Sequence, residues 1–222
     1  MIVTENLTKV FYAKEIETTA LDAVNLQIEK GSFLSIMGPS GCGKSTLLNM
    51  LGLLDQPTEG KIAMNGIDVS VMNEAEIAKF RNSVLGFIFQ SFHLIPALNV
   101  LDNVELPLLY RDNVSGKESR ARALEALEKV ELSHRLKHFP SQLSGGQCQR
   151  VAIARALIGN PEIILADEPT GNLDSKMGEE IMKILTEINL EGTTIVMVTH
   201  DEKIAAKSHK IIRMLDGKII EI

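Results

Sequence analysis

The sequence predicts an α/β fold with a largely parallel β-sheet and a helical insertion. Short apolar runs typical of buried strands alternate with stretches of helical periodicity near both ends of the chain. A glycine-rich segment after residue 37 joins one such run to an apolar helix, as parallel α/β sheets do. Residues from about 91 to 160 have helical patterns and few strand signals. We therefore expect a helical subdomain there, inserted into a single domain of residues 1–222.

Three strands and one helix are expected before residue 90. Residues 21–29 alternate apolar and polar side chains, as in a half-buried strand, and residues 33–37 suit a buried strand. Residues 44–54 are apolar on nearly every side, which suits a helix covered by a sheet. A third strand is expected at residues 85–89.

Two capping boxes mark helix starts in the helical part. Ser115 is followed three residues later by Glu118, and Ser144 by Gln147, so each pair can satisfy its own main-chain N–H groups. The helix that begins at Ser144 is expected to stop at Gly159-Asn160-Pro161, because this sequence is a strong termination signal.

Strand and helix alternate again over the last third of the chain. Buried strands are predicted at residues 163–166 and 194–199, with apolar residues at helical spacing between them. Two more strands, at residues 210–215 and 218–222, flank Asp216-Gly217, a sequence typical of a β-hairpin turn.

Composition and charge exclude several classes of protein. With 45% hydrophobic and 23% charged residues, the 222-residue chain is neither intrinsically disordered nor a disulfide-stapled mini-protein. Its net charge of −6 disfavours binding to nucleic acid and to an anionic membrane surface. No apolar run approaches the roughly 20 residues that span a bilayer, and the start lacks a signal-peptide pattern. We expect no nucleic-acid partner and no direct bilayer insertion.

The segment from Gly38 to Ser45 matches the pattern G-x-x-x-x-G-K-[ST] of phosphate-binding loops. Glycines let main-chain N–H groups curl around phosphate oxygens, and the following helix presents its positive N-terminus to the same anion. Lys44 can bridge the β- and γ-phosphates, and the Ser45 hydroxyl can bind Mg²⁺. The residues assigned to nucleotide binding here are Gly38, Ser40, Gly41, Cys42, Gly43, Lys44, Ser45 and Thr46.

Two acidic residues, Asp167 and Glu168, follow the apolar run at residues 163–166. They are expected at the carboxyl edge of the sheet, where ligands of α/β proteins bind. We assign Asp167 to Mg²⁺, through the hydration shell of the ion, and Glu168 to polarising the attacking water. Such a pair alone is also typical of a solvated strand end, but its combination with a phosphate loop favours the functional interpretation.

Gln90 and His200 also follow predicted strands. A lone polar residue at a strand end is usually part of the surface, but in a parallel sheet both would lie at the same edge as Asp167. Each would then reach the γ-phosphate or its attacking water, with His200 as a hydrogen-bond donor.

The segment Leu143-Ser144-Gly145-Gly146-Gln147 is a second predicted anion site, because it is a helix N-terminus with two glycines. A single nucleotide is too small to require two such anion sites from the same subunit. A head-to-tail pair of subunits, each lending this segment to the ATP of its partner, resolves the difficulty.

Over its whole length the sequence resembles the ATP-binding subunit of an ABC transporter. The resemblance rests on LSGGQ at residues 143–147, RVAIARAL at 150–157, IILADEPTGNLDS at 163–175 and VTHD at 198–201. It implies the ABC ATPase fold: a P-loop NTPase (RecA-like) core, an N-terminal antiparallel β subdomain and an inserted helical subdomain. Residues 86–96 and 103–108 resemble the MacB/LolD/FtsE group in particular.

The resemblance also implies a role for each motif. Glu168 (Walker B), His200 (H-loop) and Gln90 (Q-loop) are expected to be catalytic, and Ser45, Gln90 and Asp167 to hold Mg²⁺. The nucleotide is also expected to contact the signature residues Ser144, Gly145, Gly146 and Gln147 and the D-loop residue Asp174. The adenine ring is expected to stack on Phe11, with the adjacent Tyr12 as the alternative.

The implied function is ATP hydrolysis that drives a separate integral membrane permease, with ATP and Mg²⁺ as cofactors. In a MacB/LolD-like system the work would be export, or extraction of lipoproteins or peptides. The chain is then expected in the cytoplasm, peripheral on the inner face of the cell membrane and docked through residues 90–107. Within that region Phe92, Leu94, Ile95 and Leu98 suit either the core or the docking surface.

Three alternatives accompany this interpretation. An FtsE-like subunit would transmit force across a membrane without moving cargo. A soluble ABC ATPase would act on nucleic acid or ribosomes, but such chains usually join two cassettes or carry long coiled coils. An ATP-gated binding module with negligible turnover is disfavoured by Glu168, because the catalytic base is present.

The two cysteines, Cys42 and Cys148, lack metal-ligand spacing and are expected to be reduced thiols. Cys42 lies beside Lys44 near a predicted helix N-terminus, which predicts that it is the reactive thiol. In the head-to-tail dimer each Cys42 would face the Cys148 of the other subunit, so that mild oxidation without nucleotide would link them and MgATP would protect against it. The alternative is that both thiols are buried or shielded and no disulfide forms.

Overall fold

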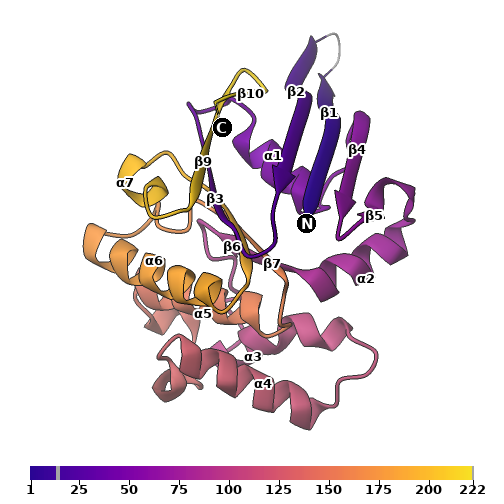
Figure 1. Ribbon diagram of the computed structural model, residues 1–222. Helices are drawn as coiled ribbons and strands as arrows, with labels where there is room; N and C mark the ends of the chain where they lie inside the picture. Colours follow the sequence, from indigo (N-terminus) through magenta and orange to yellow (C-terminus); the bar gives the residue numbers. More distant parts are fainter. Residues whose placement is uncertain (14–15, 222) are drawn as a thin grey trace.

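Two β-sheets organise the chain in the computed structural model, which describes residues 1–13 and 16–221 (Figure 1). The larger sheet has six strands in the order β10-β9-β3-β8-β7-β6. Its five strands from β9 to β6 are parallel, and β10 pairs antiparallel with β9. The strands are β3 (Phe33–Met37), β6 (Leu85–Phe89), β7 (Ile163–Asp167), β8 (Thr194–Val198), β9 (Lys210–Leu215) and β10 (Lys218–Glu221). The predicted α/β class with a largely parallel sheet is therefore confirmed.

Seven α-helices accompany the sheets in the described residues. They are α1 (Lys44–Leu51), α2 (Glu74–Val84), α3 (Val100–Glu105), α4 (Gly116–Lys129), α5 (Gly145–Leu157), α6 (Ser175–Leu190) and α7 (Glu202–Ala205), with 3₁₀ turns at Val69–Val71, Leu106–Tyr110, Ser133–Arg135 and Pro140–Gln142. None of the helices in the described part of the chain combines the length and apolar character needed to cross a membrane.

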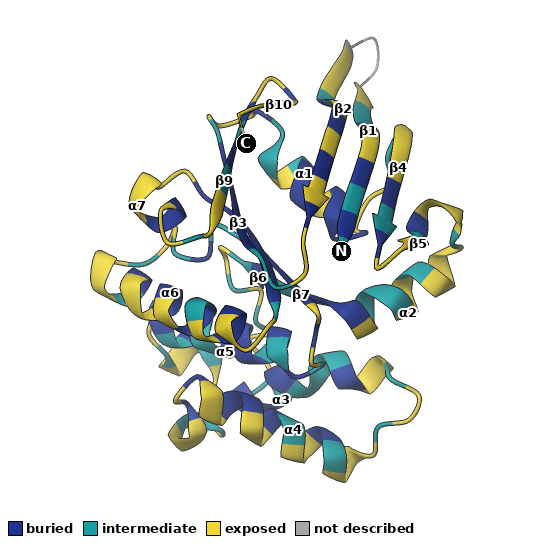
Figure 2. Ribbon diagram, in the orientation of Figure 1, coloured by how far each residue is buried: buried dark blue, intermediate teal, exposed yellow. Residues whose placement is uncertain are grey.

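The parallel sheet divides the hydrophobic core into two halves. Along β7, Ile164 and Ala166 face the half that contains α3 to α6, whereas Ile163 and Leu165 face the half that contains α1. This alternation follows from the two-residue period of a strand. Because both faces are covered, the central strands β3, β7 and β8 are buried almost along their whole length, whereas α4 and α6 turn exposed faces outward (Figure 2).

A second, antiparallel sheet covers α1. Its strands lie in the order β2-β1-β4-β5, with bounds Ile16–Ile28, Ile2–Ala13, Glu59–Met64 and Ile67–Asp68. Leu7 and Leu21 from this sheet pack with Leu47 of α1 in one buried cluster. The N-terminal antiparallel subdomain implied by the resemblance is therefore present, although the residue patterns predicted only the second half of β2.

Residues 91–160, all of which the structure describes, contain helices and no strand. The helix α5 contacts β6 as well as α3 and α4, so its buried face joins the helical part to the sheet. The division at residues 91 and 160 remains our proposal for the subdomain.

The helix predicted at residues 44–54 is shorter in the structure, where α1 ends at Leu51. A β-carbon on Gly52 would lie 2.7 Å from the Phe87 ring, so the chain passes too close to β6 at this point for another side chain. Leu53 then adopts a left-handed conformation, with φ of 53°, which cannot continue a right-handed helix.

Candidate functional site

The glycine-rich segment after β3 forms a tight loop that leads into α1. Gly38 and Gly43 have positive φ values of 154° and 100°. A β-carbon on Gly43 would lie 2.3 Å from the carbonyl oxygen of Ala20, and one on Gly38 would lie 2.3 Å from that of Met214. Only glycine therefore fits at these two positions.

Lys44 folds back over this loop. Its ammonium group donates to the carbonyl oxygens of Gly38 and Pro39, at 2.8 Å each. An ammonium group has three protons, and the third has only a long contact of 3.9 Å with Sγ of Cys42, so it can turn to a phosphate oxygen at the mouth of the loop. The loop, Lys44 and the N-terminus of α1 thus present positive charge to one place, as the sequence predicts.

Asp167 ends β7 directly beside the first turn of α1. The Ser45 hydroxyl donates to its Oδ1 at 3.4 Å. Burial is the largest influence on this carboxyl group and raises its pKa, and the charge of Glu168 raises it further. The hydrogen bond from Ser45 and the charge of Lys44 act in the opposite direction.

The donor set around Asp167 fits Mg²⁺. Carboxylate and hydroxyl oxygens are hard ligands of the type that Mg²⁺ prefers. No group of three or more His, Cys, Asp or Glu side chains with metal-binding geometry occurs in residues 1–13 and 16–221. A site with two protein oxygens matches Mg²⁺, which usually keeps water and phosphate oxygens in its other positions.

Replacing Asp167 by Asn is expected to stabilise the nucleotide-free protein at pH 7. Because the pKa of Asp167 is raised in the folded state, folding disfavours its charged form. This penalty is fully present above the folded-state pKa and disappears as the pH falls toward the unfolded value of 3.8. The midpoint temperature of thermal unfolding should therefore rise at pH 7, and the gain should shrink as the pH is lowered.

Asp174→Asn is the matched control for this change. Asp174 accepts a hydrogen bond from the Met177 N–H at the start of α6, a capping role that Asn fills equally well. Its midpoint temperature should stay at the wild-type value. An Asp167→Asn protein that is less stable than wild type at pH 7 contradicts the assigned burial effect.

Glu168 and His200 form a hydrogen-bonded pair at the same edge of the sheet. Nδ1 of His200 lies 2.7 Å from Oε1 of Glu168. The Glu168 side chain is only 15% exposed, whereas that of His200 is 72% exposed. The main-chain N–H of Glu168 donates to the carbonyl of Val198, and its φ of 46° bends the chain sharply after β7.

These groups surround one cavity of about 330 Å³. Its lining consists of Ala20, Ser40, Gly41, Gly43, Lys44, Ser45, Thr46, Glu168, Val198 and His200. The phosphate loop, the Glu168 carboxylate and the His200 ring therefore meet in one place, as the predicted strand ends require.

Gln90 lies at this edge but does not line the cavity. The register pairs Phe89 with Asp167, so Gln90 follows at the end of the neighbouring strand. Its amide donates to Oδ1 of Asn172, and Nδ2 of Asn172 donates to the Gln90 carbonyl. Sequence reasoning missed Asn172, which lies within the IILADEPTGNLDS motif but whose contact with Gln90 depends on the tertiary fold.

The signature segment lies at the start of α5. Ser144 and Gln147 form the predicted capping box: each main-chain N–H donates to the other's side chain. A β-carbon on Gly146 would lie 2.7 Å from Sδ of Met177, so α6 packs closely here. None of the residues 144–147 lines the cavity around the phosphate loop.

Phe11 lies near the end of β1, where the ammonium group of Lys9 sits 5.1 Å from its ring centroid. Phe11 and Tyr12 are both exposed, and neither lines the phosphate cavity. The stacking of adenine on one of them stays a prediction.

The expectation of a reactive Cys42 is wrong. Its side chain is only 3% exposed, because the sulfur lies beneath the loop, 2.7 Å from the position of a Gly38 β-carbon. Cys148 is also buried, and burial raises the pKa of its thiol. Both thiols are buried, so neither has the exposure that formation of the predicted disulfide requires.

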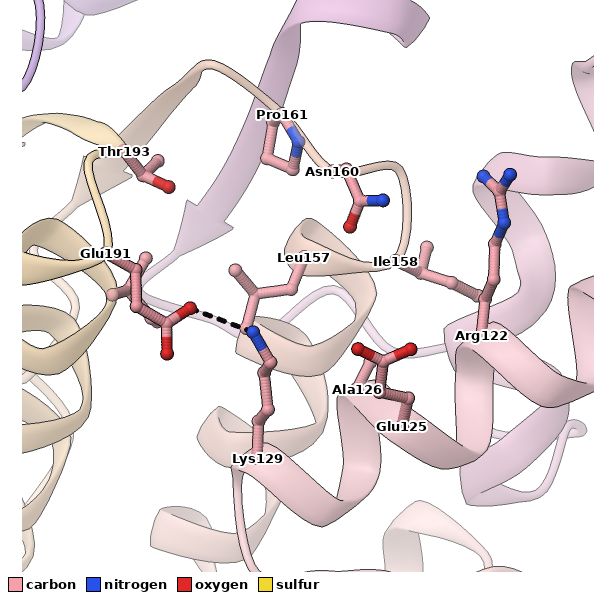
Figure 3. Close-up of a pocket in the computed structure, with 11 residues that line it drawn as sticks. Arg122, Glu125, Ala126, Lys129, Leu157, Ile158, Asn160, Pro161, Glu191 and Thr193 are labelled. Carbon is pink, nitrogen blue, oxygen red and sulfur yellow. Dashed lines mark hydrogen bonds and ion pairs between the residues drawn. The ribbon is translucent and has the colours of Figure 1, made fainter.

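A separate pocket of about 170 Å³ lies between α4 and the C-terminal ends of α5 and α6 (Figure 3). Lys129 pairs there with Glu191 at 2.8 Å, and Arg122 pairs with Glu118. The pocket shares no lining residue with the phosphate cavity, and its two cations are already paired. We therefore assign it no part in nucleotide binding.

Comparison with known proteins identifies the family. The family model described as ABC transporter matches residues 21–171. The ABC transporter ATP-binding protein MJ1508 of Methanocaldococcus jannaschii is 54% identical over 222 residues, which cover 100% of this chain and 99% of the relative. The macrolide export ATP-binding/permease protein MacB of Chlorobium luteolum is 54% identical over 93% of this chain, a match that covers 31% of MacB.

Solved structures agree with the sequence relatives. A dimeric structure of the ATP-binding cassette MJ0796, in a post-hydrolysis state bound to ADP and Pi, superposes with a TM-score of 0.92 at 51% identity. The match covers 100% of this chain and 97% of that one. The phosphate loop, the acidic strand end and the signature segment thus occur together in a fold shared with ATP-binding cassettes. The chain belongs to the ABC transporter family, as an ATP-binding subunit that hydrolyses ATP.

Proposed function

We propose that two copies of this chain form a head-to-tail dimer that encloses two MgATP. One observation carries the proposal: the phosphate loop and the Ser144–Gln147 segment are both predicted anion sites, yet they do not line the same cavity. In the dimer the signature segment of each copy completes the site of the other. The dimeric MJ0796 structures, at 51 and 52% identity, support this assembly. The experiment that tests it is the oligomeric state of the chain with MgATP, with ADP, and with ATP but no Mg²⁺.

Within each site the residues take separate tasks. Lys44 and the loop N–H groups bind the phosphates, and Ser45 and Asp167 would hold Mg²⁺, which neutralises phosphate charge when bound. Glu168 accepts a proton from the attacking water. The hydrogen bond between Nδ1 of His200 and Oε1 of Glu168 orients the carboxylate toward the cavity.

We further propose that a membrane permease docks in a groove between α2, β6, the turn at Leu106–Tyr110 and α5. The groove has a volume of about 680 Å³. Phe87, Phe89, Pro107 and Tyr110 supply apolar surface. Of the predicted docking region, residues 90–107, His93 and Pro107 line the groove. The four apolar residues Phe92, Leu94, Ile95 and Leu98 do not.

The charges of the groove favour a partner with acidic side chains. Its lining includes Lys79, Arg81 and Arg155 but, among the described residues, no Asp or Glu, although the chain as a whole carries a net charge of −6. Arg155 donates to the carbonyls of Phe92 and His93, and burial lowers the pKa of its guanidinium. A carboxylate on the docked segment would offset this poorly solvated charge.

The MacB-type relatives support a permease partner, because their printed name joins an ATP-binding part to a permease. Export is the work that we propose for this chain, since MacB and the probable syringafactin exporter SyfD are 49 to 54% identical to it. The chain would then work at the inner face of the cell membrane, held there by its partner.

Tyr110→Asp is expected to abolish co-purification of the membrane partner. Tyr110 is 80% exposed at the groove, so the change adds an unfavourable charge to a docking contact without disturbing the core. ATPase activity of the isolated chain should remain within about twofold of wild type, because the residue lies outside the phosphate cavity. Purification from membranes with a mild detergent, followed by identification of integral membrane proteins, measures the effect.

Leu190→Asp is the matched control. Leu190 is a similarly exposed apolar residue, 77% accessible at the end of α6, and it does not line the groove. Its variant should retain the partner. Retention of the partner by Tyr110→Asp would place the docking surface elsewhere.

A further inference from the structure

The chain between β7 and α6, residues 168–174, contacts the first turns of α5, as does the start of α6. A β-carbon on Gly145 would lie 3.4 Å from Leu173, and Gly146 packs against Met177. One turn further along α5, Gln149 reaches Pro169. The helix that begins with the signature segment therefore contacts the chain that carries the catalytic base.

The contact of Gln149 is a buried hydrogen bond. The side chain is 0% exposed, and its Nε2 donates to the Pro169 carbonyl at 2.7 Å. Its Oε1 has no hydrogen-bond partner in the described part of the chain. An unsatisfied buried acceptor costs free energy that opposes the gain from the bond. The bond ties α5 to the chain after β7 at Pro169.

Pro169 lies inside the turn that carries Glu168. The turn is closed by the Gly171 N–H, which donates to the Glu168 carbonyl at 3.0 Å. Glu168 itself is left-handed, with φ of 46°, a conformation that needs support from its surroundings. Gln149 bonds to the residue directly after Glu168, within this turn.

We propose that Gln149 is a positioning residue that couples the signature segment to the catalytic base of the same chain. The inference rests on the proposed head-to-tail dimer, in which the signature contacts the partner's ATP while Glu168 acts on the ATP of its own chain. Gln149 then connects the two nucleotide sites through one protomer: engagement of α5 by one ATP sets the position of the base at the other.

The test is the Gln149→Met variant, which keeps the length and flexibility of the side chain but loses the N–H donor. The kcat for ATP hydrolysis should fall by about 10- to 100-fold, the size of effect that follows from misplacing a reacting group by about 1 Å. KM for ATP should stay unchanged, because no phosphate-binding residue is altered. Added to Glu168→Gln, the substitution should leave ATP-dependent dimerisation intact.

Asn189→Leu is the control for a purely structural effect. Asn189 is also a buried amide that donates to main-chain carbonyls, those of Gly31 and Thr193, but it lies at the far end of α6. This variant should lose thermal stability and keep its kcat. Should Gln149→Met fail to fold, Gln149→Asn, whose amide is one methylene too short to reach Pro169, replaces it in the same assay.

A wild-type kcat for the folded Gln149 variant overturns the inference and leaves the dimer untouched. A parallel loss of kcat and of dimerisation also overturns it, because Gln149 would then act on assembly. If Glu168→Gln alone stays monomeric with MgATP, the proposed dimer fails, whatever the result at Gln149.

Discussion

Replacing Glu168 by Gln is expected to lower ATP turnover by about 10²- to 10⁴-fold, the range for loss of a general base. Gln keeps an oxygen that can accept the hydrogen bond from His200, so the geometry around the cavity should persist. ATP binding should also persist, because Lys44 and the loop N–H groups are unchanged. Bound ATP that is not hydrolysed should then hold two chains together as a stable dimer.

Steady-state phosphate release and size-exclusion chromatography with light scattering measure the two effects. Removal of Mg²⁺ by EDTA should prevent dimer formation, since Ser45 and Asp167 would lose the ion that offsets the phosphate charge. Glu162→Gln is the control, because Glu162 lies just before β7, at the opposite end of the strand, and should leave turnover unchanged. A Glu168→Gln chain that remains monomeric with MgATP contradicts the head-to-tail assembly.

The parallel sheet could be predicted from sequence because its strands are buried on both faces. The strands β7 and β8 each contain four consecutive apolar residues followed by a polar residue, which indicates both that they are buried strands and where they end. The strand β1 lacks such a signal. Its register shifts around Leu7 and Lys9, and left-handed Asn6 breaks the two-residue alternation on which recognition of a strand depends.

The sequence patterns also did not predict helix α2, because it lacks a clear periodic signal. Only Val84 is fully buried along its length, so no apolar stripe marks the helix in the sequence. Its start carries a complete capping box between Asn73 and Glu76, and this was the available signal.

The residues of the site also differ in whether the sequence alone could place them. Lys44, Asp167, Glu168 and His200 could be placed together because each lies at or after the carboxyl end of a strand of one parallel sheet. The contacts of Asn172 with Gln90 and of Gln149 with Pro169 join segments 82 and 20 residues apart. Such contacts depend on how α5 and the chain after β7 pack, which no local pattern encodes.

Ser144→Arg is expected to abolish hydrolysis while leaving ATP affinity of the monomer nearly intact. Ser144 lies outside the cavity that Lys44 and Ser45 line, so we expect ATP bound by one chain not to contact the Ser144 of that chain. In the dimer the arginine would replace the Ser144 hydroxyl that is expected to contact the γ-phosphate bound to the partner subunit. Loss of a preorganised donor of this kind lowers turnover by about 10²- to 10³-fold, and the added bulk should also prevent closure.

A matched variant separates this effect from simple loss of a helix cap. Ser115 caps α4 as Ser144 caps α5, by accepting from the N–H three residues later. Both substitutions should therefore cost about 1 kcal/mol of stability, but Ser115→Arg should keep wild-type hydrolysis. Lys44→Ala, by contrast, should weaken nucleotide binding to the monomer, since Lys44 lies in the phosphate loop. Titration with a fluorescent ATP analogue measures the affinity of each monomer. If Ser144→Arg and Lys44→Ala lose equal affinity, the signature segment contacts the nucleotide of its own chain. The physical reason for the head-to-tail dimer is then removed.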